Sequence, residues 1–325
     1  MAVVRVGSGL TATRLHVEQV GPPPEQAEPL LWITGFAISS EIFAPVVGSY
    51  AERFSCIRYD NRGSGRSQAP WRLTSIPELA GDAVRLLDAL GVDSAHVYGL
   101  SMGGMVAQEM AIRFPDRVRA LVLGATSHGG PRSVPPSPQV AATLATRGAP
   151  VALRAELVSR ALFTDEYRRS SPGQARAHLA NLAAHRATAR GLVSHTLAAS
   201  YHDTRARLHL VQAPTLVLHG QQDRLTPVGN AHRLAALIPD ATLAVLPDAA
   251  HGYLLEQPEE SHRLLVDWLD ARAPVAPGRP LRGLAAATEP LTRVLGLPVG
   301  ALRTGASLAS FATRARRPTP RRQET

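Results

Sequence analysis

Short apolar runs alternate with amphipathic stretches along the chain from about residue 30 onward. The runs with the length and composition of buried strands lie at 30–35, 55–60, 95–100, 119–126, 214–220 and 242–247. The stretches around them predict helices near 41–51, over 76–91, from Met102 onward and over 258–272. Strands that alternate with helices form parallel sheets, because each crossover helix returns the chain to the same end of the sheet. The pattern therefore predicts an α/β fold with a mostly parallel central sheet flanked by helices.

A different kind of sequence interrupts this alternation at residues 128–207. It begins with a Gly/Pro/Ser-rich loop and continues as alanine- and arginine-rich helical sequence without a strand pattern. We expect these residues to form a helical lid inserted into a core that consists of residues 1–127 and 208–272.

Histidines recur within the predicted lid at wide intervals. Metal ligands on a helix need closer pairs, three or four residues apart, with carboxylate or thiolate neighbours. We therefore interpret the histidines as part of a solvated, arginine-rich helix face. They are His178, His185, His195 and His202.

The formal net charge of +9 comes mainly from the C-terminal segment 273–325. All 35 basic residues are arginine, which excludes the Schiff-base and phosphate-loop chemistry of lysine. Nine arginines and two acidic residues lie in 273–325, so residues 1–272 carry a net charge of only +2. We expect a basic, flexible tail and no nucleic-acid partner for the folded part. Arginines alternate with apolar residues in the tail, which leaves contact with an anionic membrane surface as an alternative.

Other functional classes are excluded by what the sequence lacks. No apolar run is long enough to span a membrane, and residues 1–20 lack the apolar centre of a signal peptide, so we expect a cytoplasmic protein. The single cysteine, Cys56, excludes an internal disulfide and a multi-cysteine metal site. We expect Cys56 to be a small buried side chain. No pattern indicates a metal, nucleotide or flavin, so we expect no cofactor.

The expected strand at 95–100 runs directly into the sequence GLSMG at 99–103. A Gly-x-Ser-x-Gly motif between a strand and a helix places its serine on a strained turn, with the hydroxyl above the sheet. The N–H of the next residue, Met102, then lies at a helix N-terminus, where it can stabilise an oxyanion. Ser101 is therefore the candidate nucleophile.

A serine hydroxyl needs a base to remove its proton and an acid to orient that base. His251 follows an apolar strand in a loop of small residues, and Asp223 directly follows the strand at 214–220. One crossover separates the two loops, so both side chains are expected at the same edge of the sheet. The order Ser101, Asp223, His251 is the chain order of the nucleophile-elbow hydrolases.

Five separated motifs together resemble the α/β-hydrolase-fold family over about residues 28–272. The overall pattern is similar to its esterase, enol-lactonase and cofactor-free haloperoxidase branch. The motifs are WITGF (32–36), YDNRGSGRS (59–67), GLSMGG (99–104), HGQQDRLTP (219–227) and DAAHGYLLEQP (248–258).

The resemblance implies a serine hydrolase with Ser101 as nucleophile, His251 as base and Asp223 as acid. It also implies an oxyanion hole made from the backbone N–H groups of Phe36 and Met102. One departure concerns the segment before Phe36, where many relatives have His-Gly and this chain has Thr-Gly at 34–35. The serine nucleophile argues against the dehalogenase and epoxide hydrolase reactions, for which relatives use an aspartate.

The segment 60–67 contains recurring glycines and arginines but lacks the spacing of a phosphate-binding or dinucleotide-binding loop. We interpret it as a hydrogen-bonded turn that supports the catalytic edge of the sheet.

The expected activity is hydrolysis of a small-molecule carboxylic ester or lactone through an acyl-enzyme. The same residues leave open thioester or carbon–carbon bond cleavage, cofactor-free haloperoxidation, and a receptor-like protein that binds a ligand on this fold. The substrate and the oligomeric state do not follow from the sequence.

Overall fold

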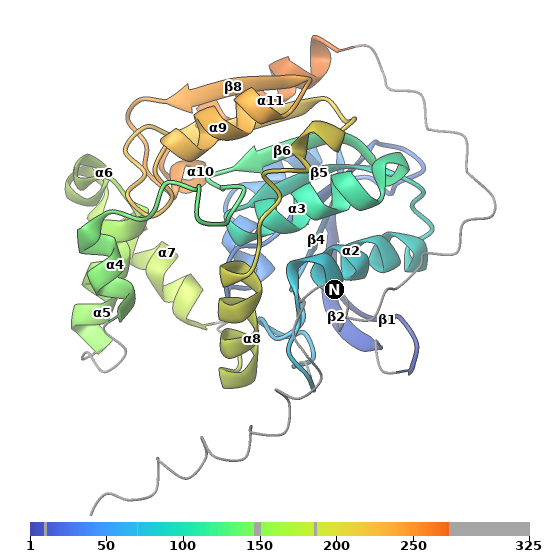
Figure 1. Cartoon of the computed structure of the whole chain (residues 1–325), viewed down its shortest axis with the longest axis horizontal. Coiled ribbons are helices and arrows are strands. Elements are labelled where there is room, and N and C mark those ends of the chain that lie inside the picture. Colours follow the sequence, from blue (N-terminus) through green and yellow to red (C-terminus); the bar gives the residue numbers. More distant parts are fainter. Residues whose placement is uncertain (10–11, 70, 146–150, 185–186, 273–325) are drawn as a thin grey trace, which may run out of the picture. The chain divides into compact units, whose positions relative to one another are not determined.

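The computed structural model describes residues 1–9, 12–69, 71–145, 151–184 and 187–272 of the 325-residue chain. Within these residues an eight-stranded sheet has the spatial order β1-β2-β4-β3-β5-β6-β7-β8 (Figure 1). β1 pairs antiparallel with β2 and β2 antiparallel with β4, whereas all other neighbours are parallel. The strands are β1 (Ala2–Val6), β2 (Thr13–Val20), β3 (Pro29–Ile33), β4 (Ser55–Tyr59), β5 (Ala95–Leu100), β6 (Val118–Gly124), β7 (Thr215–Gly220) and β8 (Ala241–Leu246).

Strands β3, β4, β5 and β7 are buried along their whole length. A strand covered on both faces reads as a continuous apolar run, which is why these strands could be predicted. The expected strands at 119–126 and 242–247 correspond to β6 and β8. The hairpin β1–β2 was not predicted as strands, because an antiparallel edge alternates polar and apolar residues and its pairing partner cannot be read from the alternation.

Helices cover both faces of the sheet and close two separate apolar cores. α2 (Ile76–Ala89), α3 (Met102–Arg113) and α9 (Gly229–Leu237) contribute to the core on one face. α1 (Val47–Ala51), α10 (Tyr253–Glu256) and α11 (Pro258–Asp270) contribute to the core on the other. Short 3₁₀ segments are η2 (Ser40–Phe43), η3 (Pro115–Arg117) and η4 (Leu208–Leu210). A mostly parallel sheet with helices on both faces confirms the predicted α/β fold.

The helix α2 shows how local sequence fixes an element. Ser75 accepts a hydrogen bond from the N–H of Glu78, and the Glu78 carboxylate accepts from the N–H of Ser75, which forms a capping box. Leu79, Ala83 and other apolar residues at helical spacing are then fully buried against the sheet.

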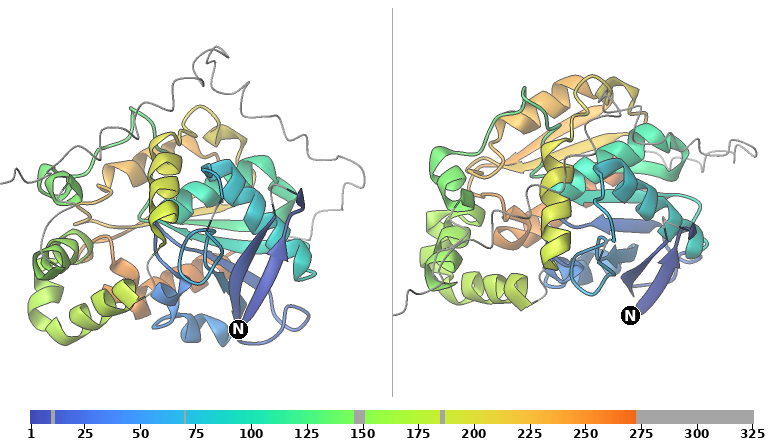
Figure 2. Two further views of the ribbon diagram at one scale, coloured as in Figure 1. Left: turned by 90° about the horizontal axis from the view of Figure 1, so that it is seen from below. Right: turned by 60° about the horizontal axis from the view of Figure 1, so that its bottom comes forward.

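Helices α4 to α8 all lie between β6 and β7 in the sequence. α4 to α7 gather at one side of the sheet, and α8 stands apart from them beside the core (Figures 1 and 2). An isolated antiparallel bridge between Gly129 and Asp203 joins the two ends of the insertion. The helices are α4 (Pro138–Ala145), α5 (Val151–Leu162), α6 (Asp165–Ser170), α7 (Pro172–Ala184) and α8 (Ala189–Ser200).

The interpretation of the lid histidines as a solvated face is wrong for two of them. His195 and His202 have exposed fractions of 0% and 4%, and His178 is half-buried. His185 lies outside the described residues. Wide spacing excluded helix-borne metal pairs, but it carried no information about which histidines the core would cover.

The sequence led us to expect neither a membrane-spanning helix nor a metal site, and the structure bears on both only within the described ranges. No helix there is both long and apolar enough to cross a membrane. No group of three or more histidine, cysteine or acidic side chains in the same ranges has an arrangement suited to a metal ion. The basic tail 273–325 lies outside the described residues, and the cytoplasmic location stays a prediction.

Candidate active site

Ser101 lies between β5 and α3 in a backbone conformation that non-glycine residues rarely adopt, with φ at 56° and ψ at −120°. Three hydrogen bonds hold this conformation. The Ser101 N–H donates to the carbonyl of Gly124 at 2.8 Å, and the Ser101 carbonyl accepts from the Gly104 N–H at 2.9 Å and from Thr126 Oγ1 at 2.6 Å. Strained backbone of this kind persists where surrounding structure enforces it and is concentrated at functional sites.

Small residues allow the turn to pack against the neighbouring strand. A Cβ atom on Gly103 would lie 2.1 Å from the Ile33 carbonyl oxygen, and one on Gly99 would lie 2.4 Å from the Gly103 carbonyl oxygen. Both distances are shorter than any real Cβ contact. The two glycines of the motif are therefore required by the close approach of α3 to β3 and β5.

The loop after β3 passes next to Ser101. A Cβ atom on Gly35 would lie 3.3 Å from the Ser101 Cβ, and Phe36 follows directly. Met102 is the first residue of α3, and N–H groups in the first turn of a helix have no acceptor within the helix. The two predicted oxyanion donors thus belong to two segments that are next to Ser101, the loop after β3 and the start of α3.

Asp223 and His251 form a hydrogen bond in which His251 Nδ1 donates to Asp223 Oδ2 at 2.8 Å. Asp223 follows β7 and His251 follows β8, which are adjacent parallel strands. Both side chains are buried, with the Asp223 carboxylate fully covered. The structure therefore brings together two of the three side chains that the sequence predicts.

Further donors keep the Asp223 carboxylate charged despite its burial. Asp223 Oδ1 accepts the N–H groups of Leu225 at 2.8 Å and Thr226 at 2.7 Å, and His219 Nε2 lies 3.2 Å from Oδ2. Burial alone raises the pKa of Asp223, but the charge of His251 and the hydrogen bonds from His219 and His251 outweigh it and lower the pKa to about 2. A charged carboxylate in this position fixes the His251 tautomer with a free Nε2.

The Ser101 hydroxyl is not hydrogen-bonded to His251 within the described residues. The two residues come from the same edge of the sheet, where parallel strands β5, β6, β7 and β8 all end. Catalytic hydrogen bonds are often long without substrate and tighten when it binds.

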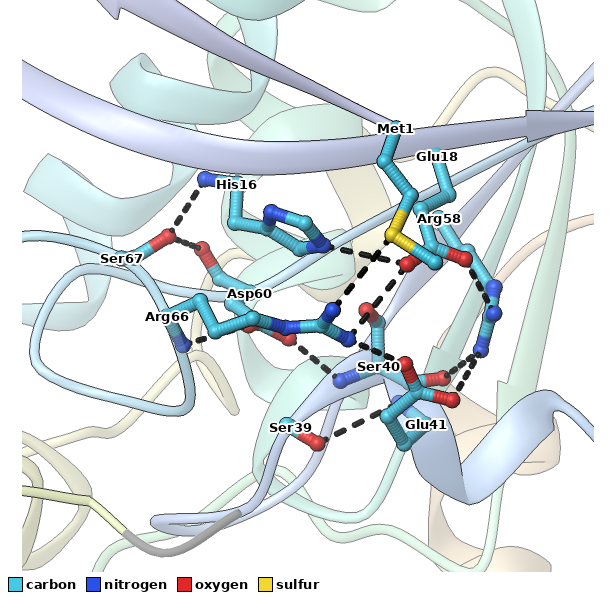
Figure 3. A network of polar contacts seen from close by, with 10 residues as sticks. All are labelled: Met1, His16, Glu18, Ser39, Ser40, Glu41, Arg58, Asp60, Arg66 and Ser67. Carbon is cyan, nitrogen blue, oxygen red and sulfur yellow. Dashed lines mark hydrogen bonds and ion pairs between the residues drawn. The ribbon is translucent and has the colours of Figure 1, made fainter.

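The segment 60–67 is the hydrogen-bonded turn that the sequence predicted. The Asp60 carboxylate accepts the N–H groups of Ser40 at 2.6 Å and Arg66 at 2.8 Å, and Ser67 Oγ donates to the Asp60 carbonyl at 2.6 Å (Figure 3). Asn61 Nδ2 donates to the carbonyl and to Oγ1 of Thr34, both at 3.2 Å. Thr34 therefore ties the loop that carries Phe36 to this turn, in the place where many relatives have histidine.

Buried charges continue the network on the outer side of the turn (Figure 3). The carboxylate of Glu18 in β2 contacts Arg58, Arg66 and His16. Burial raises the pKa of Glu18, but His16 and the two arginines outweigh it, so the pKa lies below the ordinary value. The Glu18 carboxylate thus joins side chains from β2, β4 and the turn at 60–67, so we interpret the network as support for the sheet edge.

Two segments of the insertion between β6 and β7 bond directly to the candidate site, and sequence reasoning missed both. At the His251 loop, the Gly252 N–H donates to the Leu162 carbonyl at 2.7 Å. Glu256 accepts the N–H groups of Ala250 and Thr164, each at 2.6 Å. The only sequence signal for these contacts was the position of Glu256 within the motif at 248–258.

The second contact involves His195 of α8. Its Nδ1 lies 3.2 Å from the backbone nitrogen of Ala37, and its Nε2 lies 2.9 Å from the Arg62 carbonyl oxygen. The partners are far apart in sequence, so spacing could not have indicated these bonds.

Comparison with known proteins gives one family. A family model described as the alpha/beta hydrolase fold matches residues 28–258. The chain is 32% identical over 274 residues to RutD of Variovorax paradoxus, named for carbamate hydrolysis; the match covers 82% of this chain and 99% of that protein. It is 30% identical over 277 residues to the pimeloyl-[acyl-carrier protein] methyl ester esterase of Chromobacterium violaceum, covering 80% and 99%.

The solved structure of the enol-lactonase from Burkholderia xenovorans superposes with a TM-score of 0.70 at 27% identity. The superposition covers 79% of this chain and 97% of that chain. These similar proteins thus differ in the activity that their names give.

Proposed function

Because the chain belongs to the α/β-hydrolase-fold family and is a hydrolase, we propose that it cleaves a carboxylic ester or lactone through an acyl-enzyme. We assign the chemistry to Ser101, His251 and Asp223, with the N–H groups of Phe36 and Met102 as the oxyanion hole. The proposed working unit is the core of residues 1–127 and 208–272 with the lid of residues 128–207.

The observation that carries the proposal is the 2.8 Å hydrogen bond from His251 Nδ1 to a buried, charged Asp223 carboxylate. A histidine held in this tautomer presents Nε2 as a base. The strained backbone of Ser101 at the same sheet edge supplies the matching nucleophile. A receptor-like protein has no need to preserve a charged acid, an oriented base and a strained serine together.

The proposed reaction begins when His251 Nε2 removes the Ser101 proton as Oγ attacks the substrate carbonyl carbon. The tetrahedral oxyanion accepts hydrogen bonds from the two backbone N–H groups. Protonated His251 then gives its proton to the leaving alcohol oxygen, the C–O bond breaks, and an acyl-Ser101 remains. Water enters, loses a proton to His251 and attacks the acyl carbonyl, which releases the acid and restores Ser101.

The named activities of similar proteins support an acyl carbonyl with a heteroatom leaving group. They are a carbamate hydrolase, a methyl ester esterase and an enol-lactonase. All three reactions break a bond from a carbonyl carbon to nitrogen or oxygen, which the same serine chemistry can achieve. Esters, lactones and carbamates are therefore the first substrates to compare.

Labelling with a fluorophosphonate probe tests the proposal. Wild type should be labelled, whereas Ser101→Ala and His251→Ala should not be. Ser170→Ala and His232→Ala remove the same groups at exposed positions and should be labelled like wild type. Removing Ser101 or His251 should also lower ester turnover by about three or more orders of magnitude.

A folded wild type that is neither labelled nor active on p-nitrophenyl esters, lactones and carbamates would contradict the proposal. Labelling that persists in Ser101→Ala would assign the nucleophile to another residue.

A further inference from the structure

His195 of α8 connects the inserted lid to two loops of the core. Its ring is fully buried, with an exposed fraction of 0%. The Arg62 carbonyl can only accept a hydrogen bond, so the Nε2 atom at 2.9 Å from it carries the ring proton. Nδ1 is then unprotonated and accepts the N–H of Ala37 at 3.2 Å.

Ala37 is itself unusual. Its φ of 55° places it in the left-handed region, which a residue with a side chain occupies only when neighbouring groups enforce it. Both of its backbone polar groups are bonded by the lid, because the Ala187 N–H donates to the Ala37 carbonyl at 3.3 Å. Ala37 directly follows Phe36, whose N–H is the proposed oxyanion donor of this loop.

The His195 ring also packs edge-on against the Phe36 ring, with centroids 6.4 Å apart. A single lid side chain therefore touches the residue that carries the donor and fixes the backbone of the next one. Burial lowers the pKa of His195, partly offset by the hydrogen bond with Arg62, which favours the neutral ring that this bonding requires.

α8 has other anchors that do not involve this loop. Ser194 Oγ accepts the N–H of Thr74 at 2.8 Å, and the Thr188 N–H donates to the Gly63 carbonyl at 3.1 Å. Gly191 packs so closely on Gly63 that a Cβ there would lie 2.1 Å from its carbonyl oxygen. Helix docking and loop support are thus carried by different residues.

We propose that His195 is a positioning residue that holds the Phe36–Ala37 segment in the conformation needed for an oxyanion donor, and so couples the lid to the acyl-transfer step. The proposal rests on the proposed serine hydrolase function. His195 contacts neither the reacting atoms nor the triad; it acts through the backbone at Ala37.

The test compares His195→Phe, His195→Asn and Ser194→Ala in the full chain. His195→Phe removes the acceptor but keeps a buried ring, so kcat for p-nitrophenyl esters should fall about 10- to 100-fold with little change in KM. His195→Asn retains an acceptor near the Nδ1 position and should recover most of the loss. Ser194→Ala removes a neighbouring anchor of α8 and should lower Tm while kcat stays within about twofold of wild type.

A wild-type kcat in His195→Phe, or an equal loss of kcat in Ser194→Ala, would overturn the positioning role. Hydrogen exchange of the Ala37 amide in wild type gives a measurement that needs no variant. The amide should be protected, and exchange at the rate of a free amide would also overturn the proposal.

Fluorophosphonate labelling of wild type and Ser101→Ala distinguishes failure of the His195 role from failure of the serine hydrolase proposal. Serine-dependent labelling with an unaffected His195→Phe would reject only the role of His195. Absence of labelling in folded wild type would reject the serine hydrolase and the positioning role together.

Discussion

Arg62 and Asp82 form a buried, two-pronged ion pair, with Nε to Oδ2 at 2.5 Å and Nη2 to Oδ1 at 2.6 Å. The exposed fractions of the two side chains are 3% and 1%. Asp82 belongs to α2, so the pair fixes the turn at 60–67 to that helix. The Arg62 carbonyl in turn accepts the His195 hydrogen bond. The contact between α8 and the turn thus depends on a buried charge pair that holds the turn in place.

Breaking the ion pair between Arg62 and Asp82 should lower the stability of the protein. Asp82→Asn removes the buried negative charge that Arg62 contacts, and we expect the free energy of unfolding to fall by about 3–5 kcal/mol. Urea denaturation measures the change. The exposed pair of Glu260 and Arg263 is the control, because solvent screens this pair and Glu260→Gln should leave the free energy of unfolding nearly unchanged. Similar losses of unfolding free energy in Asp82→Asn and Glu260→Gln would show that burial does not make the Arg62–Asp82 pair more important for stability than an exposed pair.

Gly103→Ala should damage the protein, whereas Gly48→Ala should not. The new Cβ at position 103 would meet the Ile33 carbonyl oxygen at 2.1 Å, but nothing lies within 4 Å at position 48 in α1. We expect a loss of several kcal/mol of stability or of folding for the first, and a gain of up to about 1 kcal/mol for the second. Thermal unfolding compares them, and a stable, active Gly103→Ala would contradict the tight approach of α3 to β3.

His202 should make the protein less stable between pH 6.5 and 4. Burial lowers the pKa of His202 from 6.5 to about 4, and the carboxylates of Glu109 and Asp203 only partly offset this. Between these pH values His202 is protonated in the unfolded chain but not in the folded chain. The contribution of neutral His202 to stability is therefore fully present above pH 6.5 and declines as the pH falls. The loss should approach about 3 kcal/mol.

His202→Leu isolates this contribution, because neither ring nitrogen of His202 has a hydrogen-bond partner within the described residues. Denaturation at pH 7, 5.5 and 4 should show a smaller pH dependence in His202→Leu than in wild type. The exposed His209 provides the control, and His209→Gln should behave like wild type. Parallel curves for wild type and His202→Leu would assign the acid sensitivity to other groups.

Cys56 should resist thiol reagents in the folded protein. Its side chain is fully buried in β4, and burial raises the pKa of its thiol to about 12. Because the thiolate is the reactive form, Ellman's reagent should react with one thiol only after denaturation. Rapid reaction of the native protein would indicate that β4 opens to solvent.

Much of the core could be predicted from the sequence, because buried parallel strands leave a local apolar signature. The strand predicted at 95–100 is β5 (Ala95–Leu100), and the helix predicted over 76–91 is α2 (Ile76–Ala89). The candidate residues Ser101, Asp223 and His251 were each recognisable from the strand that precedes them. The antiparallel hairpin β1–β2 was missed, because its strands are recognised only when paired.

The support of the site could not be predicted in this way. Glu256 bonds to Thr164, 92 residues away in the sequence, and His195 bonds to Ala37, 158 residues away. Helical spacing suggested that His195 faces solvent, whereas packing of α8 on the turn at 60–67 buries it. No local sequence pattern indicates a contact between residues that are so far apart in the chain.

The sequence by itself determined the alternation of strands and helices, the strained turn at Ser101 and the order of the candidate catalytic residues. These features depend on neighbouring residues, because backbone propensity, burial period and turn chemistry act over a few positions. Only the tertiary structure decided that Asp223 reaches His251, that the turn at 60–67 supports Thr34, and that the lid bonds to Ala37 through His195. Those contacts form when loops from separate parts of the chain meet at one edge of the sheet, where burial removes water and makes each unpaired polar group costly.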